Sequence, residues 1–264
     1  MKLVKVVFAG AGNVAARMSL SMREAGFSIL QVFSRTEESA RMLGERLACG
    51  FTTETEDIRP DADLYVFSVK DDALPDIIAK TPANRGLWLH TAGSVPANVF
   101  EGFAERYGVI YPLQTLSKNR ETDFSKIPLF VEGNTEACER ELLLVAERLS
   151  ECVRTMSSEN RRYLHLAAVF ACNFSNHMYG IATRILEERG IDRQVLQPLI
   201  DETANKLHAM PPGEAQTGPA VRYDRSVMDR HLAMLNDSDI RTLYELISRS
   251  IHIINHRGMP PVNH

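Results

Sequence analysis

Short apolar segments alternate with amphipathic segments over the first 155 residues. Strand-like runs are predicted at 2–9, 29–33, 51–53, 64–68, 87–90, 109–111, 129–132 and 153–155. Helical periodicity is predicted between them at 13–25, 37–47, 74–80, 95–106 and 136–149. Strands joined by helical crossovers pair in parallel, with helices on both faces of the sheet. The pattern therefore predicts an α/β fold with a doubly wound, mainly parallel sheet, which binds ligands at the carboxyl ends of its strands.

The pattern changes near residue 156, after which only helices are expected. They are predicted at 159–189, 193–210, 226–235 and 240–256, with a Pro- and Gly-rich loop at 211–223. The change predicts an α/β domain over 1–155 and an all-helical C-terminal domain over 156–264. A helical domain of roughly 110 residues buries only a modest core. We therefore expect its remaining apolar faces to pack against a neighbouring domain or a second copy.

Gly10 begins a G-x-G-x-x-A motif that leads from the first strand into the first helix. Gly10 permits a tight turn, Gly12 lets a pyrophosphate approach the backbone, and Ala15 lets helix and strand pack closely. The free N–H groups around Asn13 and Val14, together with the helix dipole, would stabilise the anion. The motif predicts that the first domain is a Rossmann-type dinucleotide-binding domain.

The residues after the second strand favour NADP(H) over NAD(H) as the cofactor. A carboxylate there would bind the ribose 2′-hydroxyl, but the chain has Ser34 and Arg35 instead. A guanidinium binds a 2′-phosphate through charge-assisted hydrogen bonds, whereas an acidic side chain would repel it. The alternative is that Ser34 only caps a helix and Arg35 is a solvated surface charge.

Further cofactor contacts are expected after the fourth and fifth strands, whose carboxyl ends meet at one edge of the sheet. Small residues there let the backbone pass close to a nicotinamide ring. These candidates are Val69, Lys70, Thr91, Ala92 and Gly93.

Composition and charge exclude several function classes. Thirty basic and thirty-four acidic residues give a net charge of -4. The chain therefore lacks the excess of positive charge with which proteins bind nucleic acid or an anionic membrane. No apolar run approaches the ~20 residues of a membrane-spanning helix. The four cysteines are scattered without a C-x-x-C pair, which indicates neither a metal site nor a disulfide framework. We expect a cytoplasmic protein that acts on a small molecule.

Several segments resemble known families. Gly10–Asn13 and Ser34-Arg35 are similar to the NADP-binding domain of coenzyme F420-dependent NADP oxidoreductases, pyrroline-5-carboxylate reductases and 6-phosphogluconate-dehydrogenase-like enzymes. Residues 90–94, 111–115, 165–170 with Asn173-Phe174, and 216–222 resemble, more specifically, the Rossmann-like proteins with a DUF2520 C-terminal domain. The resemblance covers nearly the whole chain and implies a helical C-terminal domain that forms a homodimer, with a substrate cleft between the domains. It names no substrate. The family often has His where this chain has Tyr111, so that imidazole is absent here.

Hydride transfer needs positioning and a proton donor or acceptor. His165, on the first long helix of the second domain, is the candidate acid or base, and Asn173 is a candidate for orienting the substrate. In a regular α-helix the two lie about 12 Å apart along the axis and are offset by ~80° around it, so we expect them at different ends of a ligand. Alternatively, His165 is a structural residue that bonds a backbone carbonyl. Lysine-using hydroxyacid dehydrogenases have a lysine where this chain has Val169, which argues against their chemistry.

Gln114 and Thr115 follow the sixth strand and are candidates for substrate binding. Arg222 lies in a loop and either holds a substrate carboxylate or phosphate, or pairs with Asp224 or Asp229. The sequence thus predicts an NADP(H)-dependent oxidoreductase that acts on a small polar C=O, C=N or C–OH group. Two alternatives stay open: an NADP-binding sensor or scaffold without turnover, and a deazaflavin such as F420 as redox partner.

Overall fold

The computed structural model describes residues 4–257. Its internal contacts divide the chain into two compact units, Met1–Met178 and Tyr179–His264. The division falls within a long helical stretch, and the domain boundary expected between residues 155 and 156 stays a prediction.

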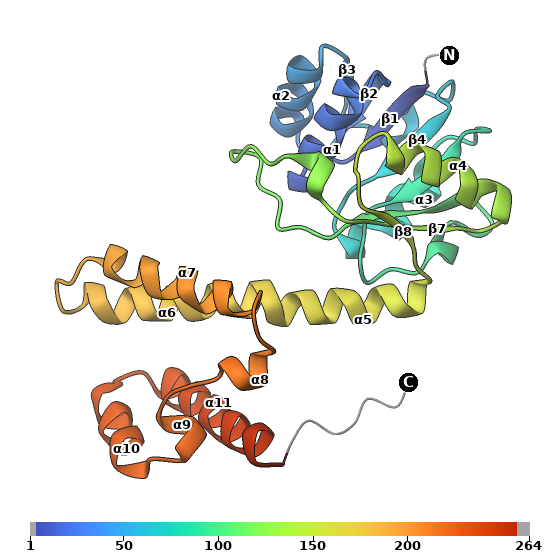
Figure 1. Cartoon of the computed structure of the whole chain (residues 1–264). Coiled ribbons are helices and arrows are strands. Elements are labelled where there is room, and N and C mark those ends of the chain that lie inside the picture. Colours follow the sequence, from blue (N-terminus) through green and yellow to red (C-terminus); the bar gives the residue numbers. More distant parts are fainter. Residues whose placement is uncertain (1–3, 258–264) are drawn as a thin grey trace. The chain divides into compact units, whose positions relative to one another are not determined.

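One eight-stranded sheet forms the centre of the first unit, with the order β3-β2-β1-β4-β5-β6-β7-β8 (Figure 1). All neighbouring strands are parallel except β6 and β7, which are antiparallel. The strands are β1 Lys5–Ala9, β2 Ser28–Phe33, β3 Gly50–Thr52, β4 Leu64–Phe67, β5 Leu87–His90, β6 Tyr107–Pro112, β7 Leu129–Gly133 and β8 Val153–Thr155. The predicted doubly wound, mainly parallel fold is confirmed. The strand order reverses between β1 and β4, which places a ligand crevice at their carboxyl ends.

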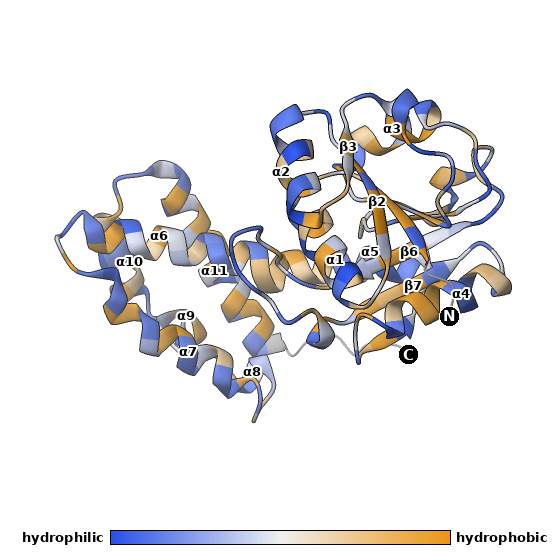
Figure 2. Ribbon diagram, turned by 90° about the horizontal axis from the view of Figure 1, so that it is seen from above, coloured by the Kyte–Doolittle hydropathy of each residue, from blue (hydrophilic) through white to orange (hydrophobic). Residues whose placement is uncertain are grey.

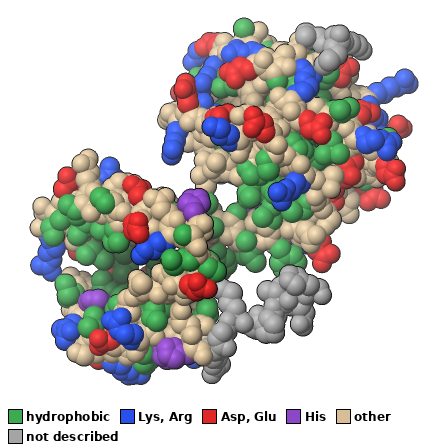
Figure 3. Space-filling view, in the orientation of Figure 1, with side chains coloured by type: hydrophobic (Ala, Val, Ile, Leu, Met, Phe, Trp, Pro, Cys, Tyr) green, Lys and Arg blue, Asp and Glu red, His purple; other side chains and the backbone are tan. Residues whose placement is uncertain are grey.

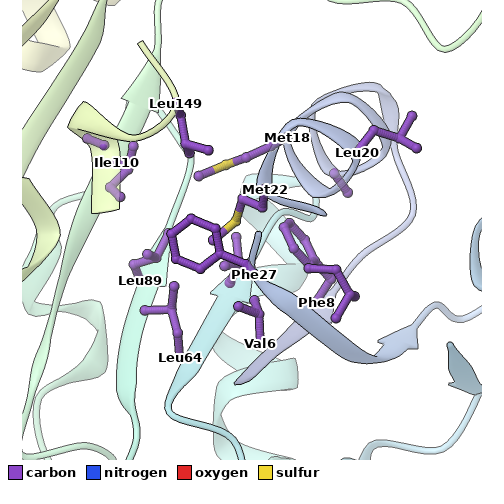
Figure 4. Packing of buried hydrophobic residues seen from close by; sticks show 14 of the residues in the cluster. Val6, Phe8, Met18, Leu20, Met22, Phe27, Leu64, Leu89, Ile110 and Leu149 are labelled. Carbon is purple, nitrogen blue, oxygen red and sulfur yellow. The ribbon is translucent and has the colours of Figure 1, made fainter. Parts of the chain in front are cut away.

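Helices cover both faces of this sheet. They are α1 Asn13–Glu24, α2 Glu37–Leu47, α3 Leu74–Lys80, α4 Glu136–Glu147 and α5 Ser158–Ala168. On one face, Met18 and Met22 of α1 pack against Val6, Phe8 and Phe27 (Figure 4). The other face is built around Trp88 and the side chains of α3. Because alternate residues of a strand face opposite sides, Ile110 of β6 joins the first cluster while Tyr111 points to the side where α5 packs.

The helix predicted over 95–106 is wrong. The structure has only a 3₁₀ turn there, Ala97–Phe100. The carbonyl of Val95, which a helix would pair with the amide of Val99, accepts from Arg161 of α5 instead. The amide of Ala97, which has no partner within a helix that starts at 95, donates to the Ser158 hydroxyl of α5. At Val95 a tertiary hydrogen bond has therefore replaced the local one.

The helix predicted over 159–189 is present, but it is not regular. Between α5 and α6 Ser175–Glu187 lies a π-helical segment, Val169–Phe174. A π-turn contains more residues than an α-turn, so successive side chains rotate by less than ~100° about the axis. This changes which residues share a face with His165.

The remaining helices of the second unit are α7 Gln197–Lys206, α8 Pro212–Ala215, α9 Pro219–Arg222, α10 Arg225–Met234 and α11 Ser238–Arg257. The loop expected at 211–223 thus contains two short helices. Strand β2 is coloured mostly as hydrophobic, whereas these helices alternate hydrophobic and hydrophilic positions (Figure 2). Of the described side chains in this unit, only Ala220, Met228 and Ser248 are buried. Within residues 4–257, no helix is long and apolar enough to cross a membrane.

Candidate functional site

A cavity of about 1070 Å³ opens at the carboxyl ends of the parallel strands. Its volume exceeds the ~300–1,000 Å³ of ordinary small-molecule sites, which suits a dinucleotide together with a second small ligand. All of its lining residues belong to the first unit. The predicted site residues that line it are Gly10, Gly12, Asn13, Val14, Ser34, Arg35, Val69, Lys70, Thr91, Ala92, Gly93, Gln114, Thr115, His165 and Asn173.

The glycine turn after β1 has the geometry of a phosphate cradle. Gly10 has a φ of +127° and donates its N–H to the carbonyl of Phe33 at 2.7 Å. A Cβ atom there would lie 2.1 Å from the carbonyl oxygen of Ser68, so only glycine fits. Gly12 is the N-cap of α1, and a Cβ there would meet nothing within 4 Å. No side chain caps this helix, which leaves its first N–H groups available to an anion.

The Asn13 side chain supports a neighbouring segment. Its Oδ1 accepts the backbone N–H of Lys118 at 3.2 Å. One turn further along α1, Arg17 donates Nε–H to the carbonyl of Ser117 at 2.9 Å. The backbone of Asn13 still belongs to the cradle, while its side chain fixes the β6–β7 segment beside it.

The carboxyl end of β2 presents hydroxyl groups and a guanidinium. Ser34, Arg35, Thr36 and Ser39 all line the cavity. The Arg35 side chain is exposed and has no ion-pair partner among residues 4–257. These hydroxyl groups and the guanidinium fit a 2′-phosphate. The phosphate carries up to two negative charges, and its oxygens accept hydrogen bonds from all of these donors. The residues after the second strand that were selected from the sequence did not include Thr36 and Ser39. Thr36 directly precedes α2, and the first turn of α2, which begins at Glu37, brings Ser39 to the cavity.

The ends of β4 and β5 are tied together beneath the cavity. Thr91 donates its hydroxyl to Ser68 Oγ at 3.0 Å. Buried His90 accepts the N–H of Ala92 on Nδ1 at 3.1 Å, and its Nε2 bonds the carbonyl of Pro96 at 3.3 Å. These bonds require the neutral imidazole with its proton on Nε2. Burial, aided by the Arg161 charge, lowers the pKa of His90 to about 3.

This buried imidazole makes stability depend on pH. The unfolded chain protonates His90 near pH 6.5 and the native chain only near 3, so the stabilising contribution is complete above pH 6.5 and is lost as pH falls between these values. We expect the free energy of unfolding of the wild type to fall, relative to His90→Gln, by up to about 1.4 kcal/mol per pH unit below pH 6.5. Urea unfolding of both proteins at pH 7, 6 and 5 measures this. Parallel pH curves would show that His90 does not carry the effect.

A tyrosine and a histidine meet where the cavity borders α5. The Tyr111 hydroxyl lies 3.0 Å from Nδ1 of His165, and the two rings meet edge to face with centroids 6.0 Å apart. Tyr111 is 8% exposed, and burial raises its pKa, so the hydroxyl stays protonated near neutral pH. His165 lies directly against Gly93, where a Cβ atom would come within 2.7 Å of the imidazole. The close approach of Gly93 therefore requires glycine.

Arg161 fixes the helix that carries His165. It is fully buried, forms an ion pair with Glu132 of β7, and donates to the Val95 carbonyl at 2.6 Å. Ser158 joins the same cluster through its own hydrogen bond to Glu132 at 2.7 Å. His165 follows Arg161 by four residues, so it lies about one turn further along the same side of α5. The ion pair thus holds the imidazole against the sheet edge.

The π-helical segment brings Asn173 into the same cavity as His165. A regular α-helix would offset the two by ~80° and would align Asn176 with His165 instead. The smaller rotation per residue in 169–174 reduces that offset, and Asn176 does not line the cavity. Cys172, from the same segment, also lines it.

Comparisons with known proteins agree with this arrangement. The model of the coenzyme F420-dependent NADP oxidoreductases matches residues 5–88, and that of a domain of unknown function, DUF2520, matches 127–251. A Bacteroides fragilis protein, provisionally assigned as an NADP oxidoreductase, is 46% identical over 95% of this chain and 98% of its own, with a TM-score of 0.89. The chain belongs to the NADP oxidoreductase-like family with a DUF2520 domain. The DUF2520 match begins at residue 127, and therefore includes β7, α4 and β8 of the sheet.

Two solved structures of lower sequence identity share the fold. Protein TM1727 from Thermotoga maritima is 20% identical over 95% of this chain and 99% of its own, with a TM-score of 0.76. A reductive aminase from Aspergillus terreus, solved in complex with NADPH and ethyl-5-oxohexanoate, is 14% identical over 97% and 95%, with a TM-score of 0.70. A search of functionally curated proteins gives no significant match.

Two residues that line the cavity, Tyr111 and Lys118, are not among the predicted site residues, because no periodic pattern points to them. One predicted site residue lies outside the cavity lining. Arg222 lies exposed in α9 of the second unit and is not in the cavity lining. Its substrate role stays a prediction, as does a substrate cleft between domains.

Proposed function

We propose that the protein is an NADP(H)-dependent oxidoreductase that uses one end of the cavity for the cofactor phosphates and the other for hydride transfer. The observation that carries this proposal is that a single cavity combines the glycine cradle with the Tyr111–His165 pair. The cofactor-binding residues are Gly10, Gly12, Asn13 and Val14 at the pyrophosphate, Ser34 and Arg35 at the 2′-phosphate, and Val69, Lys70, Thr91, Ala92 and Gly93 along the path to the nicotinamide. Membership of an NADP oxidoreductase-like family supports it.

The substrate would lie against the π-helical segment and the end of β6. Asn173, Gln114 and Thr115 line the cavity there with neutral hydrogen-bonding groups, among apolar neighbours such as Leu113 and Ala168. This environment suits a small molecule with a polar C=O, C=N or C–OH group. We also propose that Arg222 binds a carboxylate or phosphate group of the substrate.

The Tyr111–His165 pair supplies the proton that this chemistry needs. The reduced nicotinamide, when bound, provides a hydride to the substrate carbon. The electron pair of the C=O or C=N bond moves to the oxygen or nitrogen, which takes the proton of the Tyr111 hydroxyl. His165 then relays a proton from solvent, taken up at Nε2 and released from Nδ1, which restores the tyrosine hydroxyl. A positioned acid of this kind contributes roughly 10²- to 10⁴-fold to a rate.

Turnover with a defined substrate panel tests the proposal. Purified protein and NADPH are mixed with aldehydes, cyclic imines and 2-keto acids, and the absorbance of reduced nicotinamide is followed. Consumption of NADPH with at least one class is expected. Tight binding of NADPH without turnover of any class would instead favour a sensor or scaffold, which has no need of a Tyr–His pair in its cavity.

We also propose that the protein is a homodimer through its C-terminal helices. Hydrophobic side chains lie on the surface of these helices (Figure 3). Among the most exposed are Val195 at 62%, Leu199 at 63% and Leu246 at 59%. Apolar surface on this scale marks an interface that is covered in the assembled protein. Sedimentation velocity of the full chain should give the dimer mass of about 59 kDa, twice the 29.6 kDa chain. A monomer at all concentrations would contradict the proposal.

A further inference from the structure

A lysine on the segment between β6 and β7 lies beside the glycine cradle. The backbone N–H of Lys118 donates to Asn13 Oδ1 at 3.2 Å, and Lys118 lines the same cavity as Gly12 and Asn13. Its side chain is exposed and has no ion-pair partner among residues 4–257. A lysine without an ion pair in the described part of the chain therefore lies beside the N-terminus of α1.

The segment that carries Lys118 is held at three points. Arg17, which is 9% exposed, donates to the carbonyl of Ser117 at 2.9 Å. Leu116 on one side and Phe124 on the other are buried in the main core, at 9% and 6% exposure. These contacts hold the backbone at 118 against α1, while the lysine side chain is exposed.

We propose that Lys118 binds the pyrophosphate of the dinucleotide, opposite the N-terminus of α1. The inference rests on the proposed NADP(H) site and adds a binding residue to it. A pyrophosphate carries two negative charges, whereas a helix N-terminus offers only about half a positive charge. Lysine binds phosphate as a point charge and needs no fixed fork geometry, which suits a flexible side chain on a fixed backbone.

Other charges in the cavity lie elsewhere on the sheet edge. Arg35 follows β2, and Lys70 and Asp71 follow β4, where Asp71 accepts the hydroxyl of Ser94. Lys118 is therefore the cation assigned to the pyrophosphate and Arg35 the one assigned to the 2′-phosphate. This division predicts two different binding signatures, because NADH has the pyrophosphate but lacks the 2′-phosphate.

The test is a titration of the full chain and its variants with NADPH and with NADH, which requires no substrate and no turnover. Lys118→Gln should weaken both cofactors by the same factor, about tenfold, and leave the ratio of their dissociation constants unchanged. Arg35→Gln should weaken NADPH alone. Lys118→Arg keeps the charge and should bind both cofactors within about threefold of the wild type. The matched control is Lys126→Gln on the same segment, because Lys126 is 78% exposed, pairs with Asp123 and does not line the cavity.

Any other result of these titrations contradicts the assignment or the proposed function. If Lys118→Gln lost only NADPH binding, the lysine would bind the 2′-phosphate and not the pyrophosphate, which would overturn the assignment. Unchanged binding of both cofactors, in a variant whose thermal unfolding matches the wild type, would also overturn it. Should Lys118→Gln fail to fold, equal weakening of both cofactors in Lys118→Met would support the assignment and unequal weakening would refute it. Wild-type protein that binds neither cofactor would refute the proposed function itself, and that result appears before any variant is made.

Discussion

Tyr111→Phe should lower the turnover number by about 100-fold while leaving NADPH binding unchanged. The variant removes one hydroxyl and keeps the ring that packs beside Phe130. Without that hydroxyl, no group at this position gives a proton to the substrate oxygen or nitrogen. Because burial already raises the pKa of Tyr111, the wild-type pH profile should show no loss of activity from tyrosine ionisation below about pH 10.

His165→Asn separates the hydrogen bond from proton transfer. The asparagine amide can still contact the Tyr111 oxygen, but it cannot relay a proton between two ring nitrogens as an imidazole does. We expect a similar loss of turnover. Tyr163→Phe is the matched control, since Tyr163 lies on the same helix and is 68% exposed. Wild-type turnover numbers in both variants would show that the pair is structural.

Arg35→Glu should reverse the cofactor preference. The change replaces the guanidinium assigned to the 2′-phosphate with a carboxylate that repels it, and offers the 2′-hydroxyl of NADH an acceptor. We expect the dissociation constant of NADPH to rise by about 100-fold and that of NADH to change by less than about threefold, both measured by fluorescence titration. In energy, 100-fold corresponds to roughly 2.7 kcal/mol, the magnitude of one or two charge-assisted hydrogen bonds.

Arg41→Glu controls for the change of net charge. Arg41 lies on the same helix, α2, pairs with Glu45 at 3.0 Å and does not line the cavity. It should affect both cofactors little. Equal losses of NADPH and NADH in Arg35→Glu would remove the 2′-phosphate assignment.

The parts of the site that depend on local sequence could be predicted, because the chain itself fixes their geometry. The glycine turn, the start of α1 and the residues after β2 follow one another along the first βαβ unit. Each strand end also places its next residues at a known edge of the sheet. For that reason Gly93 and Thr115 could be assigned to this edge from the sequence, and both line the cavity, although nothing in their own spacing encodes a contact.

The Tyr111–His165 pair could not be predicted in the same way. The two residues are 54 positions apart, and they meet because the buried ion pair of Arg161 with Glu132 docks α5 on the sheet. The π-helical segment could not be predicted either, because its pattern of apolar and polar residues is also compatible with a regular α-helix. The helix expected over 95–106 is absent for a related reason: the Val95 carbonyl accepts a hydrogen bond from Arg161 of α5, a partner far away in the sequence.

The most direct measurement is a titration of the wild-type protein with NADPH and with NADH, followed by energy transfer from Trp88. This is the single tryptophan of the chain, and it lies buried in β5, the strand that leads to Gly93. We expect both cofactors to bind, with NADPH bound at least tenfold more tightly than NADH. Binding of neither cofactor, or NADH bound as tightly as NADPH, would contradict it.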